Sequence, residues 1–280
     1  MSDRNRVGVY SNGEADTNIF YRSVSSVAGE VARSYVPFIR YTPATLQNAV
    51  RLLADVIPRV EPRILDVGTG TGVVARAVAN VTSGSVVGLD ISLEMISALR
   101  AGAYSQVTGI VADARRLPFL SGHFDAVVFA FSLHLFEEPL SALSEAARVL
   151  KPGGRIAVLC PLLEDLQKQL FHKYMPHFHR HDAPRTLTLQ KLQAWVEQVG
   201  LRNGPLLRED FEIPFGTPDE FVEFVQHKPF FGLQQITEEE FQADIAHLKS
   251  ELARHPSGVP VVTQGTLTTV VYDKRKEKLG

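Results

Sequence analysis

The feature that most constrains this chain is a short apolar stretch that runs into a glycine-rich turn over residues 63–72, RILDVGTGTG. The apolar residues before the turn are typical of a buried strand, and a helix is expected over 72–80. Three glycines, Gly68, Gly70 and Gly72, let the backbone bend sharply and let a ligand approach without meeting Cβ atoms. The free amide groups of the helix would face that ligand. Together these elements predict a nucleotide-binding α/β unit.

Two acidic residues indicate which nucleotide suits this turn. Asp66 stands two residues before Gly68, where it would repel a pyrophosphate, and Val73 replaces the third glycine of the dinucleotide fingerprint G-x-G-x-x-G. A carboxylate at a strand tip suits a cationic amino group instead. Asp90, about 20 residues further on at the end of a second strand, is placed for two ribose hydroxyls. An adenosine that carries an amino acid, S-adenosylmethionine, fits both acids.

Successive segments over roughly residues 60–160 resemble the motifs of the class I S-adenosylmethionine-dependent methyltransferases. The segments are LDVGTGTG, GLDIS, VADARRLPFLSGHFDAVVFAFSLHLF and EAARVLKPGGRIAVL. The nearest similarity is to the small-molecule branch that includes the ubiquinone and menaquinone biosynthesis enzymes. The glycine turn alone would be weak evidence, but five motifs in the family's order are specific. Outside this core the resemblance is loose, so it does not identify a substrate.

Short apolar strands alternate with helices along the core, which predicts an α/β fold with a doubly wound, mainly parallel sheet. The strands are expected near 63–67, 85–90, 106–112, 124–130, 155–160 and 206–213. The helices are expected near 72–80, 92–101, 139–150 and 188–199. The turn KPGG at 151–154 is expected to precede the fifth strand. The resemblance implies a Rossmann-like seven-stranded sheet whose last strand, near 266–272, is antiparallel.

The chain divides into three expected regions. Residues 1–58 are expected to form an N-terminal helical segment over the cofactor site, with a helix at 43–57. Residues 59–160 are expected to form the cofactor-binding core, and residues 161–280 the remaining strands with a helical cap for substrate. Capping boxes of Thr217 with Glu220 and of Thr237 with Glu240 begin two helices of the cap, each contributing about 1 kcal/mol. Inserted between the last two strands, these helices would lie over the strands' carboxyl ends, where open α/β sheets bind ligands.

Composition excludes several classes of partner. The chain has 280 residues, a formal net charge of −2 and a pI near 6.5, which favour neither nucleic acid nor an anionic membrane surface. A single cysteine, Cys160, allows neither an intramolecular disulfide nor a cysteine-based zinc site. With no signal peptide and no apolar run of about 18 residues, a cytoplasmic protein without membrane insertion is expected. An oligomer is possible, but its state cannot be read from the sequence.

The resemblance assigns the cofactor contacts at the first two strands. Asp66 is expected to attract the ammonium group of the methionine portion, directly or through water, while the glycine turn lies against that portion. Asp90 is expected to bind the ribose hydroxyls. Ile91 is expected to lie against the adenine face.

The next two strands complete the expected cofactor site. Asp113 resembles the family acid that accepts from the adenine amino group, and Ala114 supplies an amide nearby. Phe131 and Ser132 are expected near the sulfonium. The alternative is that Asp113, like Asp90, merely caps the helix that follows it.

Methyl transfer disperses charge, so a dry and well-aligned pocket supplies most of the catalysis. His134, in FAFSLHLF, lies where the family brings the sulfonium close to the acceptor, and it is the candidate general base. Its alternative role is a structural hydrogen bond beneath the cofactor. Six phenylalanines are expected to form the core of the cap, with one or two facing substrate: Phe211, Phe215, Phe221, Phe224, Phe230 and Phe231.

The run HKYMPHFHRHD contains four histidines, His172, His177, His179 and His181. Catalytic zinc requires about three ligands on a rigid scaffold, whereas this stretch is expected to be a loop between prolines. No metal site is therefore expected, and the open alternatives are a substrate-facing histidine and a solvated or partner-facing loop. The spacing of three N-terminal tyrosines does not separate ligand contact from packing: Tyr21, Tyr35 and Tyr41.

The resemblance implies transfer of a methyl group from S-adenosylmethionine to a small, largely apolar acceptor such as a quinone-, phenol- or polyketide-like metabolite. Oxygen, carbon and nitrogen remain open as the methylated atom. The alternative is an enzyme that uses the bound cation to promote cyclisation or rearrangement. A binding protein would not need three acids at the strand tips. Val73 and Asp66 disfavour an NAD-dependent oxidoreductase, and FSLHLF replaces the Asn/Asp-Pro-Pro-aromatic motif of nucleic-acid amino-group methyltransferases.

Overall fold

The structure, a computed structural model, describes residues 53, 57, 61–102 and 104–275. Its centre is a seven-stranded sheet with strand order β3-β2-β1-β4-β5-β7-β6. The strands are β1 (Arg63–Val67), β2 (Ser85–Asp90), β3 (Val107–Val111), β4 (Phe124–Ala130), β5 (Leu150–Cys160), β6 (Arg202–Gly216) and β7 (Val261–Asp273). Neighbouring strands are parallel except at β7, which is antiparallel to both β5 and β6. The predicted fold class is confirmed.

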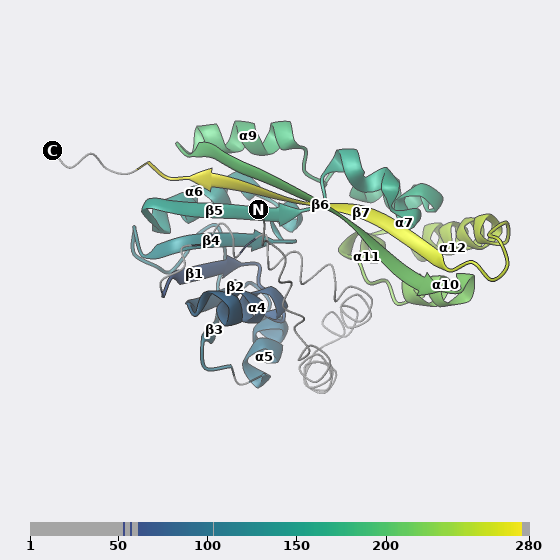
Figure 1. Ribbon diagram of the computed structural model, residues 1–280, viewed down its shortest axis with the longest axis horizontal. Coiled ribbons are helices and arrows are strands. Elements are labelled where there is room, and N and C mark those ends of the chain that lie inside the picture. The colour runs from purple at the N-terminus through teal and green to yellow at the C-terminus, as the bar shows by residue number, and fades with distance from the viewer. Residues whose placement is uncertain (1–52, 54–56, 58–60, 103, 276–280) are drawn as a thin grey trace, which may run out of the picture.

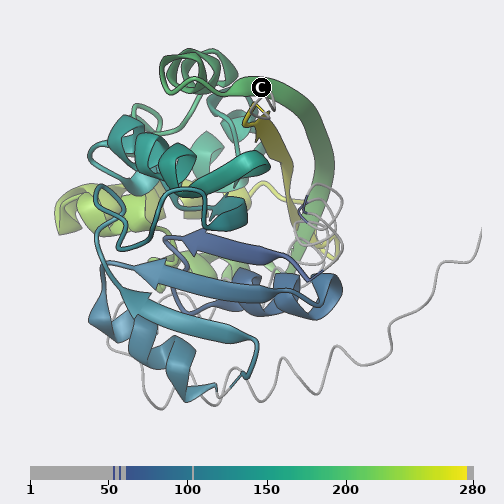
Figure 2. The ribbon, with the colours of Figure 1, turned by 90° about the vertical axis from the view of Figure 1, so that its left-hand side faces the viewer.

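Helices cover both faces of the sheet (Figures 1 and 2). On one face, α4 (Val73–Thr82) and α5 (Leu93–Ala101) bury their apolar residues against the strands. On the other face, α6 (Pro139–Val149) and α9 (Leu189–Gln198) do the same. Because the inner strands are covered on both sides, they are apolar along most of their length and do not alternate between apolar and polar residues. The four helices expected in this part of the chain are present, and their ends differ from prediction by no more than two residues.

The fifth strand begins earlier than the sequence predicts. Pairing between β4 and β5 is interrupted after Leu150 and resumes at Arg155, so the KPGG segment is an irregularity within the strand and does not precede it. Gly153 has φ of +80°, a conformation that favours glycine, and a Cβ at Gly154 would lie 2.8 Å from the carbonyl oxygen of Asp125. The glycines therefore allow the irregularity to lie close to β4.

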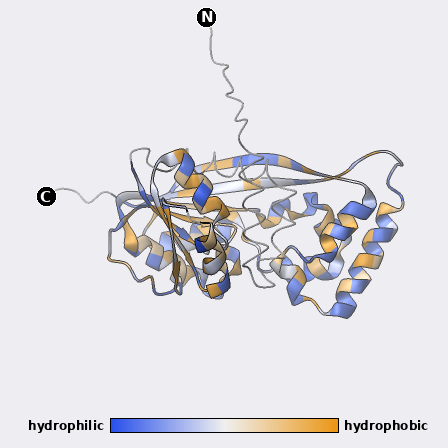
Figure 3. Ribbon diagram, turned by 90° about the horizontal axis from the view of Figure 1, so that it is seen from below, coloured by the Kyte–Doolittle hydropathy of each residue, from blue (hydrophilic) through white to orange (hydrophobic). Residues whose placement is uncertain are grey.

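β6 and β7 are longer than predicted and extend from the core of the sheet to a second group of helices (Figure 1). We call this group the cap. It consists of the 3₁₀-helix η2 (Leu163–Lys168) and of α7 (Leu170–Tyr174), α8 (Pro176–Asp182), α10 (Pro218–Gln226), α11 (Phe231–Gln235) and α12 (Glu238–Leu252). The cap has an apolar core of its own. Figure 3 shows hydrophobic and hydrophilic residues alternating along its helices, as expected for amphipathic helices that share a core.

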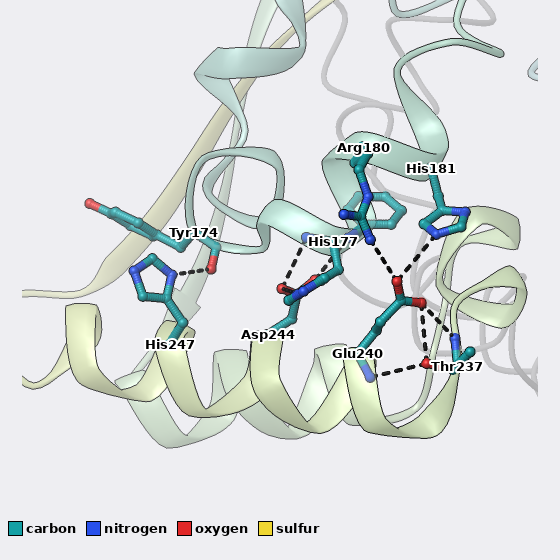
Figure 4. Close-up of polar contacts among 9 residues, drawn as sticks. Tyr174, His177, Arg180, His181, Thr237, Glu240, Asp244 and His247 are labelled. Atoms are coloured by element: carbon teal, nitrogen blue, oxygen red, sulfur yellow. Dashed lines mark hydrogen bonds and ion pairs between the residues drawn. The ribbon is translucent and has the colours of Figure 1, made fainter.

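The loop predicted between prolines around the histidine run is wrong, because η2, α7 and α8 make this stretch helical. Pro176 is the first residue of α8, a position where proline needs no hydrogen-bond partner. The side chain that caps the N-terminus of this helix lies on a distant helix. Asp244 of α12 accepts from the backbone N–H of His177 (3.1 Å) and Phe178 (2.8 Å), as Figure 4 shows for His177. No local pattern could have shown this, since the capping residue lies on a distant helix.

Both predicted capping boxes are confirmed. In the second, Thr237 accepts from the Glu240 N–H while the Glu240 carboxylate accepts from the Thr237 N–H. The same carboxylate binds Arg180 of α8 at 2.7 Å, which joins the start of α12 to α8 (Figure 4). Two carboxylates of α12, buried Asp244 and partly buried Glu240, thus bind α8.

Asp244→Ala is expected to lower the free energy of unfolding by about 2–3 kcal/mol, because the carboxylate is fully buried and two backbone donors of α8 would lose their acceptor. Urea denaturation followed by circular dichroism measures the change. Lys249→Ala, at an exposed position of the same helix, is the control and should stay within about 0.5 kcal/mol of the wild type. A loss no larger than that of the control would contradict the capping role.

The predicted N-terminal region 1–58 lies outside the described residues except for Leu53 and Ile57, which are both buried. The helix expected at 43–57 and the three N-terminal tyrosines therefore stay predictions. Among the described residues, no helix combines the length and the hydropathy needed to cross a bilayer.

Candidate functional site

One cavity of about 670 Å³ lies where the carboxyl ends of β1, β2 and β4 meet the cap. The strand order reverses between β1 and β4, and such switch points are where open α/β sheets bind ligands. Most of the predicted cofactor residues line this cavity: Gly68, Gly70, Asp90, Ile91, Asp113, Ala114, Phe131 and Ser132. His134 also lines it. Asp66 and Gly72 are not among the lining residues.

The three turn glycines serve different purposes. All have positive φ, at +72°, +56° and +78° in chain order. A Cβ at Gly68 would lie 2.5 Å from Ser132 Cβ, and one at Gly72 would lie 2.7 Å from Leu99, so these two glycines permit the turn to pack closely against Ser132 and Leu99. At Gly70 a Cβ would meet nothing within 4 Å. Gly70 therefore leaves open space on the ligand side of the turn.

Asp66 is a buried carboxyl group with one satisfied oxygen. Thr69 Oγ1 donates to its Oδ2 at 2.7 Å, whereas its Oδ1 is buried and has no hydrogen-bond partner. Burial raises the pKa of Asp66 to about 7, the Thr69 hydrogen bond opposes this, and the charge of Asp90 adds to it. A buried acceptor without a partner carries a desolvation cost that a cationic group would remove.

Asp90 joins the glycine turn to the start of α5. One carboxylate oxygen accepts from the Gly70 N–H at 2.9 Å and the other from the Ser92 N–H at 3.0 Å. The alternative that Asp90 is a helix cap is not supported, because Ser92 is the N-cap of α5 and accepts from the Met95 N–H. Each carboxylate oxygen retains a second acceptor site for a ligand hydroxyl. Beside it, Ile91 is 71% exposed on the cavity rim, as a surface for a flat apolar ring would be.

Asp113 is already engaged by a residue that the sequence reasoning missed. The Arg115 guanidinium donates to Asp113 Oδ2 at 2.9 and 2.7 Å and to Oδ1 at 3.1 Å, and it also donates to Glu138 at 3.0 Å. These contacts lower the pKa of Asp113, chiefly through the Arg115 hydrogen bonds. No helix begins between β3 and β4, so Asp113 is not a helix cap. Arg115 was visible in VADAR, but Glu138 comes from after η1 (Leu133–Leu135) and gave no local signal.

The segment after β4 brings three candidate residues together. Phe131 has φ of +56°, which is unusual for a residue with a side chain, and its N–H donates to Leu159 O at 2.8 Å. Ser132 Oγ donates to Val67 O at 2.6 Å and lies against Gly68. Burial lowers the pKa of His134 to about 4, so its imidazole is neutral near pH 7 and a weak base.

The cap contributes an aromatic wall to the cavity. Four of the predicted phenylalanines line it, more than the one or two expected: Phe211, Phe215, Phe224 and Phe230. Phe221 is fully buried in the cap core, and Phe171 and Phe178, which the prediction missed, line the cavity as well. The rings of Phe171 and Phe230 lie 4.5 Å apart. The cap core and the cavity wall are one continuous aromatic cluster, which is why more rings reach the cavity.

The histidine run is divided between the cap and the cavity. His177 Nδ1 lies 2.8 Å from Asp244 and His181 lies 3.6 Å from Glu240, both on α12 (Figure 4). His172 alone of the four lines the cavity. Within residues 61–102 and 104–275, no three histidine, cysteine or acidic residues are grouped so that they could hold a metal ion.

Comparison with known proteins connects this geometry to a class. Residues 65–158 match the family model described as a methyltransferase domain. The ubiquinone/menaquinone biosynthesis C-methyltransferase of Geobacter sp. (strain M21) is 37% identical over 127 residues, 41% of this chain and 54% of that protein. The demethylmenaquinone methyltransferase of Thermus thermophilus is 41% identical over 117 residues, 40% of this chain and 52% of that protein. The chain spans about half the length of these curated relatives.

Solved structures share the fold. A putative methyltransferase from an antibiotic biosynthesis pathway of Anabaena variabilis superposes with a TM-score of 0.62 at 18% identity, covering 80% of this chain and 96% of that one. The [4+2]-cyclase SpnF superposes with a TM-score of 0.56 at 21% identity, covering 82% of this chain and 81% of that one. At these identities the likeness concerns the fold alone.

The fold and the matched domain define a class I S-adenosylmethionine-dependent methyltransferase domain. Within that class, the chain resembles the methyltransferases of ubiquinone and menaquinone biosynthesis. The cofactor of the class is S-adenosylmethionine, and the site fits it on three points. Asp66 has an unpartnered buried oxygen, the turn at Gly70 is open, and Ile91 is exposed beside Asp90.

Proposed function

We propose that this protein transfers a methyl group from S-adenosylmethionine to a small, largely apolar acceptor that is a quinone-, phenol- or polyketide-like metabolite. The observation that carries the proposal is that one cavity is bounded by the glycine turn and acidic strand tips on one side and by the aromatic cap on the other. A cofactor at the strand tips and an acceptor under the cap would therefore share one cavity. The three regions 1–58, 59–160 and 161–280 are proposed to cover the cofactor, bind it, and bind the acceptor.

The cofactor residues are proposed to act as follows. Asp66 binds the ammonium group through its unpartnered oxygen, directly or through water, and the Gly70 region leaves room for the methionine portion. Asp90 accepts from the ribose hydroxyls, and Ile91 packs against adenine. Asp113 and Ala114 bind the adenine edge, which requires Arg115 to release or share the Asp113 carboxylate. The segment with Phe131 and Ser132 lies at the sulfonium.

The bound cofactor supplies an electrophilic methyl group on a cationic sulfur. The chain's own contribution is orientation and the exclusion of water, because water stabilises separated charges more than the dispersed charge of methyl transfer. The aromatic wall supplies such a dry environment, and neutral His134 adds no charge to it. His134 is better suited to a hydrogen bond with the acceptor than to proton removal, since its lowered pKa makes it a weak base.

Mass spectrometry tests the proposal. The protein is incubated with S-adenosylmethionine and a panel of hydroxylated naphthalenes, hydroquinones and polyketide-like phenols. The expected result is a product heavier by one methyl in place of one hydrogen, formed together with an equal amount of S-adenosylhomocysteine. Consumption of an acceptor without a change of mass would instead indicate cyclisation or rearrangement. The comparisons do not favour that alternative, because SpnF shares only the fold at 21% identity.

The pH dependence of the reaction distinguishes the roles of His134. Because its pKa is about 4, wild-type activity should show no His134 inflection between about pH 5 and 8, and His134→Asn should keep the same profile shape. Initial rates with saturating cofactor measure this. A wild-type inflection near the usual histidine pKa of about 6.5 that disappears in the variant would show that His134 is the base after all.

A further inference from the structure

The aromatic wall of the cavity contains a polar pair, His172 of α7 and Asp182 at the end of α8. The His172 ring lies 4.6 Å from the ring of Phe178 and 5.4 Å from that of Phe171, so it is part of the aromatic cluster. Its side chain is 3% exposed, whereas that of Asp182 is 22% exposed. The carboxylate is thus the accessible member of the pair.

The pair is held by contacts that leave part of the carboxylate free for a ligand. His172 Nε2 lies 3.5 Å from Asp182 Oδ2, at the outer limit of a hydrogen bond, and His172 Nδ1 lies 3.3 Å from Nδ1 of His179. Burial, with His179, lowers the pKa of His172 to about 3, so its ring is neutral. A neutral ring satisfies both neighbours when His179 donates to it and it donates to Asp182.

The other carboxylate oxygen lies against a glycine. A Cβ at Gly232 of α11 would lie 2.5 Å from Asp182 Oδ1 and 2.8 Å from Phe178. Any larger residue at this position would displace the carboxylate. The residue of α11 that lies against Asp182 therefore has no side chain, and Gly232 itself lines the cavity.

We propose that Asp182, oriented by His172, is the polar anchor of the acceptor site and accepts a hydrogen bond from a hydroxyl group on an aromatic acceptor. This inference rests on the proposed function and adds the feature by which the acceptor is recognised. The surrounding rings bind the flat apolar body of the acceptor, and the carboxylate selects those that carry a hydroxyl at the matching place. The acceptor class is then a phenol or hydroquinone.

Charge near the pair favours a neutral hydroxyl over an ammonium group. Burial raises the pKa of Asp182 to about 6, and the positive charge of Arg185 opposes that rise. The carboxylate is ionised near pH 7.5, but Arg185 already compensates it and would repel a cationic acceptor. Among the described residues, neutral His172 lies 3.5 Å from one carboxylate oxygen, and the backbone of α11 at Gly232 lies against the other.

Binding of matched probes without cofactor tests the proposal. Isothermal titration calorimetry at about pH 7.5 compares 2-naphthol with 2-methoxynaphthalene, which lacks the donor. The wild type is expected to bind 2-naphthol about tenfold more tightly, as hydrogen bonds to charged groups commonly contribute. Asp182→Asn should reduce this preference to within about twofold, because a neutral amide is a weaker acceptor. Glu223→Gln, an exposed carboxylate-to-amide change in the cap, is the control and should keep the preference.

Gly232→Ala provides a second variant should Asp182→Asn fail to fold, since it retains the carboxylate but displaces it, and it should lose the preference as well. Equal binding of the two probes by the wild type, or binding of neither, would overturn the inference. So would a preference that survives in Asp182→Asn, or tighter binding of the cationic probe 2-(aminomethyl)naphthalene than of 2-naphthol. Binding of S-adenosylhomocysteine is measured separately. If it binds while the inference is overturned, the proposed function stands without the inference; if it does not bind, the proposed function fails too.

Discussion

Replacing Asp90 with alanine is expected to weaken the binding of S-adenosylhomocysteine by about 100-fold. Hydrogen bonds to a charged group contribute about 1.5–3 kcal/mol each, and one carboxylate would accept from two ribose hydroxyls. The carboxylate is already fixed in place, because it accepts from the N–H groups of Gly70 and Ser92. Calorimetric titration of the wild type and the variant measures the loss.

The control is Asp219→Ala, which removes an exposed carboxylate on the cap helix α10. It should bind S-adenosylhomocysteine as the wild type does. Thermal unfolding of Asp90→Ala without ligand separates loss of the ribose contacts from disturbance of the turn. Unchanged affinity in a folded Asp90→Ala variant would remove Asp90 from the cofactor site.

Asp66 is expected to release close to one proton when S-adenosylhomocysteine binds at about pH 6. With a pKa of about 7, its carboxyl group is mostly protonated at that pH, and the cationic ammonium group would lower the pKa and ionise it. The ligand amino group, with a pKa near 7.7–8.0, is already protonated there and takes up nothing. Titrations in two buffers of different ionisation enthalpy measure the released protons. The release should decrease as the pH rises above about 7.

Asp66→Asn should abolish the proton release and weaken binding by about 100-fold or more, since a buried ion pair that loses one partner costs about 3–5 kcal/mol.

Without ligand, the raised pKa of Asp66 makes the free energy of unfolding depend on pH. A folded-state pKa raised from 3.8 to about 7 means that the folded state holds its proton longer than the unfolded chain. The stability contributed by Asp66 therefore falls as the pH rises from about 4 to 7, and Asp66→Asn should remove this fall. If proton release persists in the variant, the proton comes from a group other than Asp66.

The positions of the proposed cofactor residues were predictable because these residues lie at the ends of strands. Asp66, Asp90 and Asp113 each stand at or just after a strand whose apolar run is visible in the sequence. Parallel strands end at one edge of the sheet, so these residues come together once the strand order is known. What the sequence did not show is that Asp66 and Gly72 do not line the cavity, or that Arg115 already binds Asp113.

The proposed acceptor site under the cap was not predictable to the same degree. The stretch with four histidines was expected to be a loop, because its prolines resemble breaks and its helices are short. α8 exists because Asp244 satisfies its first amide groups from a position 66 residues beyond Phe178. The pairing of His172 with Asp182 likewise depends on how α7 and α8 pack against each other.

The sequence by itself determined the sheet, the glycine turn and the class of cofactor, because each depends on residues that are close neighbours along the chain or on a strand period. Only the tertiary structure decided the shape of the cap, the partner of each histidine and the polar pair in the aromatic wall. These features arise from contacts between helices far apart in the chain, and such contacts leave no local pattern of hydrophobicity or spacing.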